Sequence, residues 1–365
     1  MNKVIAAYDY SEYSVVTTDA LGWYGRVMYC RYIDENNQEI GESVRSIVFP
    51  ESVVHCCSRN GTAYMTVTKD ADGAIDQPVQ LIDRKHDTPK YYLSLCLAPI
   101  YGSQRKYLVL VELFEHLKLQ GVEHFYLYIK EIDKYSQTLI DDYIREGEAE
   151  VISLPTEHKI IYCPQIVAAA DCLHRSRHHS RYVLFSDLDE RFFSPKGYTL
   201  KSFVREKLQN APGRGAIRFT SRWVLRTPPP QSDYQGEETL KQHLPMLVFH
   251  NSSAIPNRRI VQKLVLDPRR VLIIFVHHVR AYYPGYKGYQ VPFGQMHIRS
   301  IYKENFYIHR HYRDTSTWGK QWFDRIAGFG PYEITRYPEE HMKELFENIK
   351  NRLDGIYGHR SMLTL

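Results

Sequence analysis

Residues 91–129, YYLSLCLAPIYGSQRKYLVLVELFEHLKLQGVEHFYLYI, form the stretch that decides the fold class. The apolar run over 91–100 predicts a buried strand, and Ser103 is the expected cap of a helix after it. Apolar residues then recur at the spacing of one helix face, at Tyr107, Leu110, Val111, Phe114 and Leu117. Gly121 ends this helix, and 122–129 predicts a second strand. A strand, a helix and a strand with short connections are typical of a parallel β-α-β unit.

The same alternation continues toward the C-terminus. A second helix is expected to begin at Ser136, and a strand follows over 150–154. Pro164 predicts the first turn of a third helix, which runs to about Arg177, and 181–185 (RYVLF) predicts a fourth strand. This order predicts an α/β fold with a doubly wound sheet, which binds ligands at the carboxyl ends of its strands.

The pattern of apolar residues and turns divides the chain into three parts. Residues 1–88 contain short β-rich runs and turns, and predict a small N-terminal β module that ends in a polar linker over 70–86. Residues 89–335 form the expected main domain. Residues 336–365 contain an amphipathic helix and a tail, with the helix over 339–353.

Composition excludes several classes of protein. The 365 residues are 43% hydrophobic and 24% charged, which is ordinary for a globular protein. A net charge of +5, spread without a dense basic run, does not indicate nucleic-acid binding. The sequence contains no apolar stretch long enough to span a membrane, and its N-terminus lacks the pattern of a signal peptide.

Six cysteines and two sequons bear on the cellular compartment. No C-x-x-C pair is present, and Cys30 is expected to pair with either Cys56 or Cys57 rather than these two neighbours with each other. Asn60 and Asn251 each begin an N-x-[ST] glycosylation sequon. These features favour the secretory pathway.

The sharpest chemical signal is Ser186-Asp-Leu-Asp-Glu190, directly after the strand over 181–185. Asp187 and Asp189 are two apart, so strand alternation would aim both carboxylates to one side, where they could hold Mg²⁺ or Mn²⁺. The alternative is a strand-end turn or a helix cap. Asp70 and Asp72 repeat the spacing in the polar linker, where a following glycine favours a simple turn.

Histidines offer two further metal hypotheses. The apolar run over 271–276 predicts a buried strand. His277 follows this run and could complete a site with the acidic pair; the alternative is a structural, hydrogen-bonded ring. His174 and His178 have zinc-ligand spacing on the third helix, but the glutamate of H-E-x-x-H is absent. Phosphate-loop, dinucleotide and nucleophile-elbow motifs are also absent.

Taken in order, these segments resemble glycosyltransferase family 92, once called domain of unknown function 23. The resemblance covers residues 91–313. It is carried by 98–129, by Ala170-Asp-Cys-Leu173 before the acidic motif, by Lys263 with the block that leads to His277, and by His311-Tyr-Arg313.

The resemblance implies a GT-A-like mixed sheet and a metal-dependent, inverting transfer of galactose from UDP-galactose to a glycan acceptor. It implies donor contacts at Tyr101, Asp187 and Lys263, and Mn²⁺ or Mg²⁺ held by Asp187, Asp189 and His277. It further implies a location in the Golgi lumen or on a secretory-pathway membrane, reached through an anchor that this sequence does not contain.

The sequence does not identify the catalytic base. Asp233, Glu237 and Glu238 lie in a polar stretch where acceptor-side loops are expected, and are the candidates; the alternative is a solvated loop. Two other functions stay open. One is an inactive glycan-binding paralogue on the same fold, and the other is a zinc hydrolase built on the histidine-rich helix.

Overall fold

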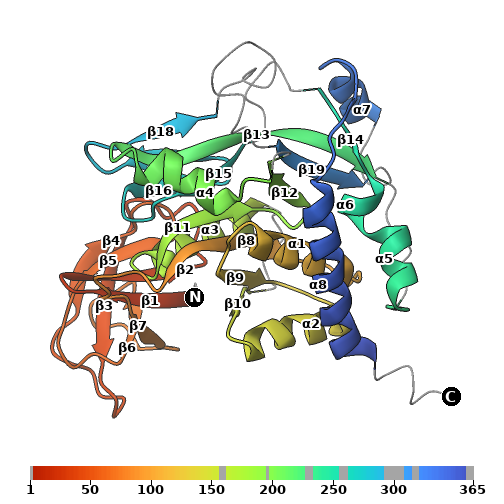
Figure 1. Cartoon of the computed structure of the whole chain (residues 1–365). Helices are drawn as coiled ribbons and strands as arrows, with labels where there is room; N and C mark the ends of the chain where they lie inside the picture. Colours follow the sequence, from red (N-terminus) through yellow and green to blue (C-terminus); the bar gives the residue numbers. More distant parts are fainter. Residues whose placement is uncertain are drawn as a thin grey trace.

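The structure contains two sheets with helices packed around the larger one (Figure 1). It is a computed structural model that describes residues 3–155, 162–194, 197–226, 233–254, 262–291, 308–314 and 320–358. In this part of the chain, no helix is both long and apolar enough to cross a lipid bilayer.

The N-terminal sheet has seven strands in the order β4-β3-β6-β7-β1-β2-β5. They are β1 (Val4–Tyr10), β2 (Tyr13–Thr18), β3 (Val27–Ile33), β4 (Val44–Ile47), β5 (Val53–Cys57), β6 (Tyr64–Thr68) and β7 (Val79–Asp83). An isolated bridge between Val48 and Val54 joins the two ends of this sheet, so the sheet curls on itself. β7 lies inside the segment expected to be a linker, and it pairs with both β6 and β1.

The second sheet has the order β10-β9-β8-β11-β15-β13-β19-β12, with β18 beside β13. Its strands are β8 (Tyr91–Ile100), β9 (His124–Ile129), β10 (Ala149–Ser153), β11 (Ser180–Ser186), β12 (Glu190–Phe193), β13 (Arg214–Arg226), β15 (Gln262–Leu266), β18 (Lys287–Gln290) and β19 (Ile308–Asp314). The first four strands of this order run parallel, whereas β15 is antiparallel to both of its neighbours. The sheet is therefore mixed, which confirms the predicted fold class.

Helices cover both faces of this sheet, because its central strands are apolar on both sides. On β8, Leu93, Leu95 and Leu97 pack into one core while Cys96 packs into the other. The longer helices are α1 (Tyr107–Leu119), α2 (Lys134–Arg145), α3 (Tyr162–Ser176) and α8 (Glu339–Tyr357). α1, α2 and α8 contact one another on the first core, and α3 packs on the second beside the N-terminal sheet. This is the doubly wound arrangement.

Shorter elements complete the described chain. These are α4 (Leu200–Val204) with a π-helical turn (Arg205–Gln209), α5 (Glu237–His243), α6 (Pro245–Val248), α7 (Lys320–Ala327), and the strand pairs β14 (Asn251–Ser252) with β20 (Glu333–Ile334) and β16 (Val271–Phe275) with β17 (His278–Tyr282). The apolar run at 271–276 was expected to be a buried strand. It instead forms one side of a separate hairpin, where Phe275 is exposed.

The helix caps differ from the predicted ones. α1 begins after Lys106, and Ser103 does not cap it. α2 begins earlier than expected, because the carboxylate of Asp133 accepts a hydrogen bond from the backbone N–H of Ser136. The hydroxyl of Ser136 instead accepts from the backbone N–H of Lys106. Gly121 does end α1, with φ of +88°, a conformation that costs glycine little.

The N-terminal sheet is fastened to α3 through one buried carboxylate, that of Asp171. Its Oδ1 accepts hydrogen bonds from the hydroxyls of Tyr8 (2.7 Å) and Thr17 in the N-terminal sheet. Its Oδ2 accepts from the hydroxyl of Tyr128 (2.5 Å) and from Nε of Arg175 (3.2 Å). Burial raises the pKa of both tyrosines, which therefore remain protonated donors. The carboxylate of Asp171 on α3 thus joins the N-terminal sheet to β9 of the second sheet.

We predict that Asp171→Asn lowers the free energy of unfolding by about 3 kcal/mol, because Arg175 then loses the closer and more deeply buried of its two carboxylate partners. The measurement is urea unfolding of the full chain. Asp141→Asn is the matched control, since Asp141 is exposed and accepts one hydrogen bond from Gln137 on the helix surface. Equal unfolding midpoints for the two variants would contradict this role of Asp171.

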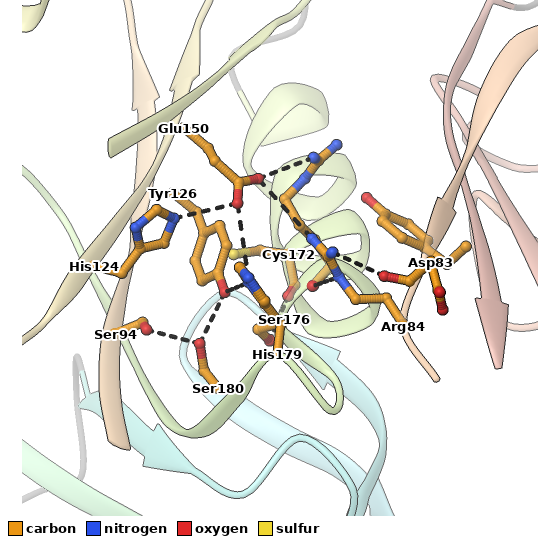
Figure 2. A network of polar contacts seen from close by, with 12 residues as sticks. Asp83, Arg84, Ser94, His124, Tyr126, Glu150, Cys172, Ser176, His179 and Ser180 are labelled. Atoms are coloured by element: carbon orange, nitrogen blue, oxygen red, sulfur yellow. Dashed lines mark hydrogen bonds and ion pairs between the residues drawn. The ribbon is translucent and has the colours of Figure 1, made fainter. Parts of the chain in front are cut away.

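A second polar network lies beside this anchor, centred on Glu150 (Figure 2). Its carboxylate oxygens lie 3.3 Å from Nε2 of His124, 3.9 Å from Nδ1 of His179 and 3.5 Å from Nη1 of Arg175. Burial would raise the pKa of Glu150, but the hydrogen bond with His124 and the charges of Arg175 and Arg84 lower it to about 2. Burial and the charge of Arg84 lower the pKa of His179 to about 3.

Both shifts make the fold sensitive to acid. Because the folded pKa of His179 lies below its unfolded value of 6.5, the unfolded chain takes up the proton first, and stability falls as pH drops below about 6.5. Glu150 adds a further loss as pH falls through 4.5 toward 2. We expect His179→Gln to remove about 2 kcal/mol of the stability difference between pH 7 and pH 5. Urea unfolding at both pH values tests this, with the exposed His278→Gln as control. An unchanged pH dependence in His179→Gln would count against it.

Candidate functional site

The acidic motif forms a tight loop at the carboxyl end of β11. The backbone N–H of Glu190 donates to the carbonyl of Asp187 (3.3 Å), and β12 begins at Glu190. The side chain of Glu190 is fully buried, and its Oε2 accepts from the backbone N–H of Asp187 (2.9 Å) and from the hydroxyl of Ser186 (3.0 Å). Glu190 therefore fixes the backbone at Asp187, where the chain leaves β11.

Lys263 lies against this loop from the next strand, β15. The antiparallel register pairs Phe185 with Leu264, which brings Lys263 beside the end of β11. Its Nζ lies 2.7 Å from Oδ1 of Asp187 and 3.5 Å from Oε2 of Glu190, and its side chain is only 3% exposed. Burial would lower the pKa of Lys263, but the charges of Asp187 and Glu190 outweigh burial and raise it. The site is thus built around a buried, protonated amine.

The carboxylates of Asp187, Asp189 and Glu190 and the ammonium of Lys263 form an ion cluster. A small hollow opens beside it. Its walls are mainly apolar and come from the ends of β8 and β11, from α3, and from the turn after β16: Cys96, Leu97, Ala98, Gln165, Ala168, Ala169, Phe185, Ser186, Asp187, Lys263 and Val276. Its inner volume is about 30 Å³, which is room for one or two water molecules.

His277 lies close to the ion cluster, and His278 does not. His277 occupies the turn between β16 and β17, with Nδ1 3.3 Å from the carbonyl oxygen of Gln262, the residue before Lys263. Burial and the charge of Lys263 lower the pKa of His277. His278 is exposed and its ring contacts Phe275. The register of β12 with β19 also brings His311 opposite Glu190, so three separate motifs of the sequence meet here.

The described side chains fit a divalent cation only in part. Among these residues, no three His, Cys, Asp or Glu side chains lie close enough together to hold one metal ion. Asp187, Asp189 and His277 therefore do not form a ready three-ligand set, and Asp187 is paired with Lys263. A magnesium-type ion nevertheless commonly uses one or two carboxylates together with substrate phosphates. The oxygen donors of this loop fit that mode, and the three-residue metal assignment stays a prediction.

A comparison of sequences places the chain among known proteins. The profile of glycosyltransferase family 92 matches residues 91–345, which is more than two thirds of the chain. This chain belongs to glycosyltransferase family 92. It is the family that the sequence resembles.

Individual relatives of this family 92 chain are more distant. The β-1,4-galactosyltransferase galt-1 of Caenorhabditis elegans is 31% identical over 131 residues, which cover 33% of this chain and 31% of that protein. Among solved structures, Staphylococcus aureus TarS 1–349 matches with 14% identity and a TM-score of 0.31, over 73% of this chain and 72% of that chain. Its complex with UDP-GlcNAc matches with 13% identity and a TM-score of 0.33, over 72% and 73%. TM-scores this low do not establish a common fold.

The remaining predicted donor and acceptor residues have other surroundings in the described structure. Tyr101 is 62% exposed, directly after β8. Asp233 forms an ion pair with Arg105, in the connection from β8 to α1. Glu237 and Glu238 lie in the first turn of α5, paired with Lys241 and Gln242 one turn further on, and α5 packs beside α6 and α8 (Figure 1). In the described part of the chain, the base candidates Asp233, Glu237 and Glu238 pair with Arg105, Lys241 and Gln242, respectively.

The expectations about cysteines and sequons have mixed outcomes. Cys30 pairs with Cys56, with a Cα–Cα distance of 6.0 Å, and Cys57 is free and exposed. A second pair that the sequence did not predict joins Cys96 of β8 to Cys172 of α3, at the back of the hollow. Asn60 and Asn251 are both exposed, and their glycosylation stays a prediction. Asp70 and Asp72 lie in a surface turn, where the carbonyl of Asp70 accepts from Gly73.

Sequence reasoning missed two residues that hold the loop in place. One is Glu190. The other is Arg191, whose Nη1 donates to the carbonyls of Leu188 (2.8 Å) and Glu190 (2.9 Å). Arg191 is itself held by the buried carboxylate of Glu112 on α1, 2.9 Å from its Nη2. Only the structure reveals this role, since it shows that β12 (ERFF) has no solvent-facing position and that its charged residues therefore need buried partners.

Proposed function

We propose that this chain transfers galactose from UDP-galactose to a hydroxyl of a glycan acceptor, with inversion at the anomeric carbon and with Mn²⁺ or Mg²⁺ as cofactor. Membership of glycosyltransferase family 92 supports glycosyl transfer. Similarity to a protein named as a β-1,4-galactosyltransferase supports galactose as the sugar.

The charge of the ion cluster is the observation that carries this proposal. Three carboxylates, those of Asp187, Asp189 and Glu190, lie within four residues, and Lys263 pairs with two of them. A diphosphate is itself anionic and is not a natural partner of these carboxylates alone. A divalent cation would bridge the two, so the chemistry of the loop supports a nucleotide diphosphate that binds together with a metal ion.

Each residue then has a separate task. The carboxylates of Asp187 and Asp189 would hold the cation, and the ammonium of Lys263 would lie against the diphosphate. When bound, the metal ion supplies Lewis-acid stabilisation of the negative charge that develops on the departing UDP. Glu190 and Arg191 keep the loop in one geometry, so little reorganisation is needed when charge develops.

Inversion requires a single in-line attack by the acceptor hydroxyl, assisted by a general base. Of the three candidates, Asp233 is the one to test first. Its partner Arg105 belongs to the connection that leaves the carboxyl end of β8, the same edge of the sheet from which Asp187 projects. Glu237 and Glu238 lie on a helix that packs beside α8.

We also propose that the chain works in the lumen of the secretory pathway, in the Golgi. Two cysteine pairs at bonding distance suit an oxidising compartment, and both sequon asparagines are accessible. Asn60 and Asn251 would then carry glycan in material isolated from its native cells.

The proposal predicts that the purified chain releases UDP from UDP-galactose when Mn²⁺ is present, and faster with a suitable glycan acceptor. Asp189→Asn should reduce this rate by about 100-fold or more, because it removes a charged ligand without removing packing. Release of UDP is measured with a coupled assay. Asp72→Asn is the control, since it changes the same residue type in a surface turn and should leave the rate unchanged.

Three outcomes would contradict the proposal. Equal rates for Asp189→Asn and Asp72→Asn would refute the role of the acidic loop. Full activity after metal removal with EDTA would refute the metal. Glycan binding without release of UDP from any UDP-sugar would favour the inactive paralogue.

The position of His277 generates a separate prediction. His277→Ala should raise the Mn²⁺ concentration needed for half-maximal rate, because His277 is the only histidine of the pair close to Lys263 and Asp187. His278→Phe should leave that concentration unchanged, since His278 is exposed and its ring contact with Phe275 is preserved. A Mn²⁺ titration of each variant tests this. A shift in His278→Phe alone would reverse the assignment.

A further inference from the structure

The two carboxylates that pair with Lys263 differ in solvent exposure. Asp187 is 19% exposed and lines the hollow, whereas Glu190 is fully buried. Lys263 is closer to Asp187, at 2.7 Å, than to Glu190, at 3.5 Å. The carboxylate that is best placed to meet a ligand is therefore also the one that Lys263 occupies most closely.

This arrangement creates a competition. A cation that binds Asp187 must share or displace the ammonium of Lys263, because both are attracted to the same oxygen atom. A buried ammonium that loses its only partner is strongly unfavourable. Metal binding at Asp187 would thus be opposed unless Lys263 has a second carboxylate at hand.

We propose that Glu190 is a positioning residue that retains Lys263 when a divalent cation takes Asp187. This inference rests on the proposed metal-dependent function. Glu190 is suited to the task because its Oε2 is fixed by the backbone N–H of Asp187 and the hydroxyl of Ser186. It is also out of reach of solvent.

The required movement is small. A shift of Nζ by about 0.8 Å toward Glu190 would give the distance that Lys263 now keeps to Asp187. The flexible four-carbon stem of a lysine allows such a shift without displacement of β15. Glu190 would thereby allow Asp187 to bind the cation while Lys263 keeps a carboxylate partner.

A double-mutant cycle on direct Mn²⁺ binding tests the inference. Isothermal titration of the full chain with MnCl₂, without donor, is measured for wild type, Glu190→Gln, Lys263→Met and the double variant. In the presence of Lys263, Glu190→Gln is expected to weaken Mn²⁺ binding by about tenfold. In the Lys263→Met background, the same change is expected to have an effect of at most about threefold, because no ammonium then needs a second partner.

The outcomes separate this inference from the proposed function. Equal weakening in both backgrounds would mean that Glu190 acts only as a nearby negative charge, and would overturn the inference while leaving metal dependence intact. Absence of Mn²⁺ binding to wild type would overturn this inference, whereas the proposed metal dependence fails only if Mn²⁺ does not bind in the presence of UDP either. Glu190→Asp keeps the charge and should bind Mn²⁺ within about threefold of wild type. A loss as large as that in Glu190→Gln would also overturn the inference.

A measurement on the unmodified chain covers the case in which Glu190→Gln does not fold. The ¹⁵Nζ resonance of Lys263, assigned with the Lys263→Met variant, is expected to shift when Mg²⁺ is added. An ammonium that stays on Asp187 would keep its resonance position, and that result would overturn the proposed transfer to Glu190.

Discussion

Lys263 brings a positive charge into a part of the protein where an unpaired charge would be very unfavourable. The sheet accommodates it through the antiparallel insertion of β15 beside β11. That register sets Lys263 at the end of β11, where two carboxylates can meet it. The loop that carries them needs its own support, which comes from Arg191 and, through it, from Glu112 of α1. The geometry of the site therefore depends on connected ion pairs and hydrogen bonds that run from Lys263 of β15 through the acidic loop to Glu112 of α1.

The helix on the other face connects the site with the N-terminal sheet. The first half of α3 contributes Gln165 and Ala168 to the wall of the hollow, and its second half carries Asp171. Cys172 also joins α3 to the strand end that forms the back of the hollow. The N-terminal sheet is fastened to Asp171 through two hydroxyls, so it stabilises the helix that shapes the hollow. Residues far apart in the sequence thus determine one wall of the candidate site.

Periodicity alone was enough to predict the β-α-β units, because the core strands and helices from β8 to β11 are strongly apolar. It was not enough for local contacts. Nothing in the spacing separates Asp133 from Ser136 as the cap of α2, since both residue types can cap and only the fold decides which is used. The apolar run over 271–276 predicts a buried strand for a similar reason, because the sequence of one strand does not show which other strand pairs with it. Within the site, the acidic pair was visible from the sequence, while the partnership of Lys263 with Glu190 depends on a strand register that no single segment encodes.

Charge also orders the events at the site under the proposed function. A cation at the acidic loop would attract a diphosphate, and it gains affinity when phosphate oxygens complete its coordination. Each ligand then strengthens the binding of the other by the same factor, as linkage requires. Lys263 moderates this coupling, because its ammonium already pairs with two carboxylates of the loop. The same lysine therefore stabilises the acidic loop and competes with a cation for the oxygen of Asp187.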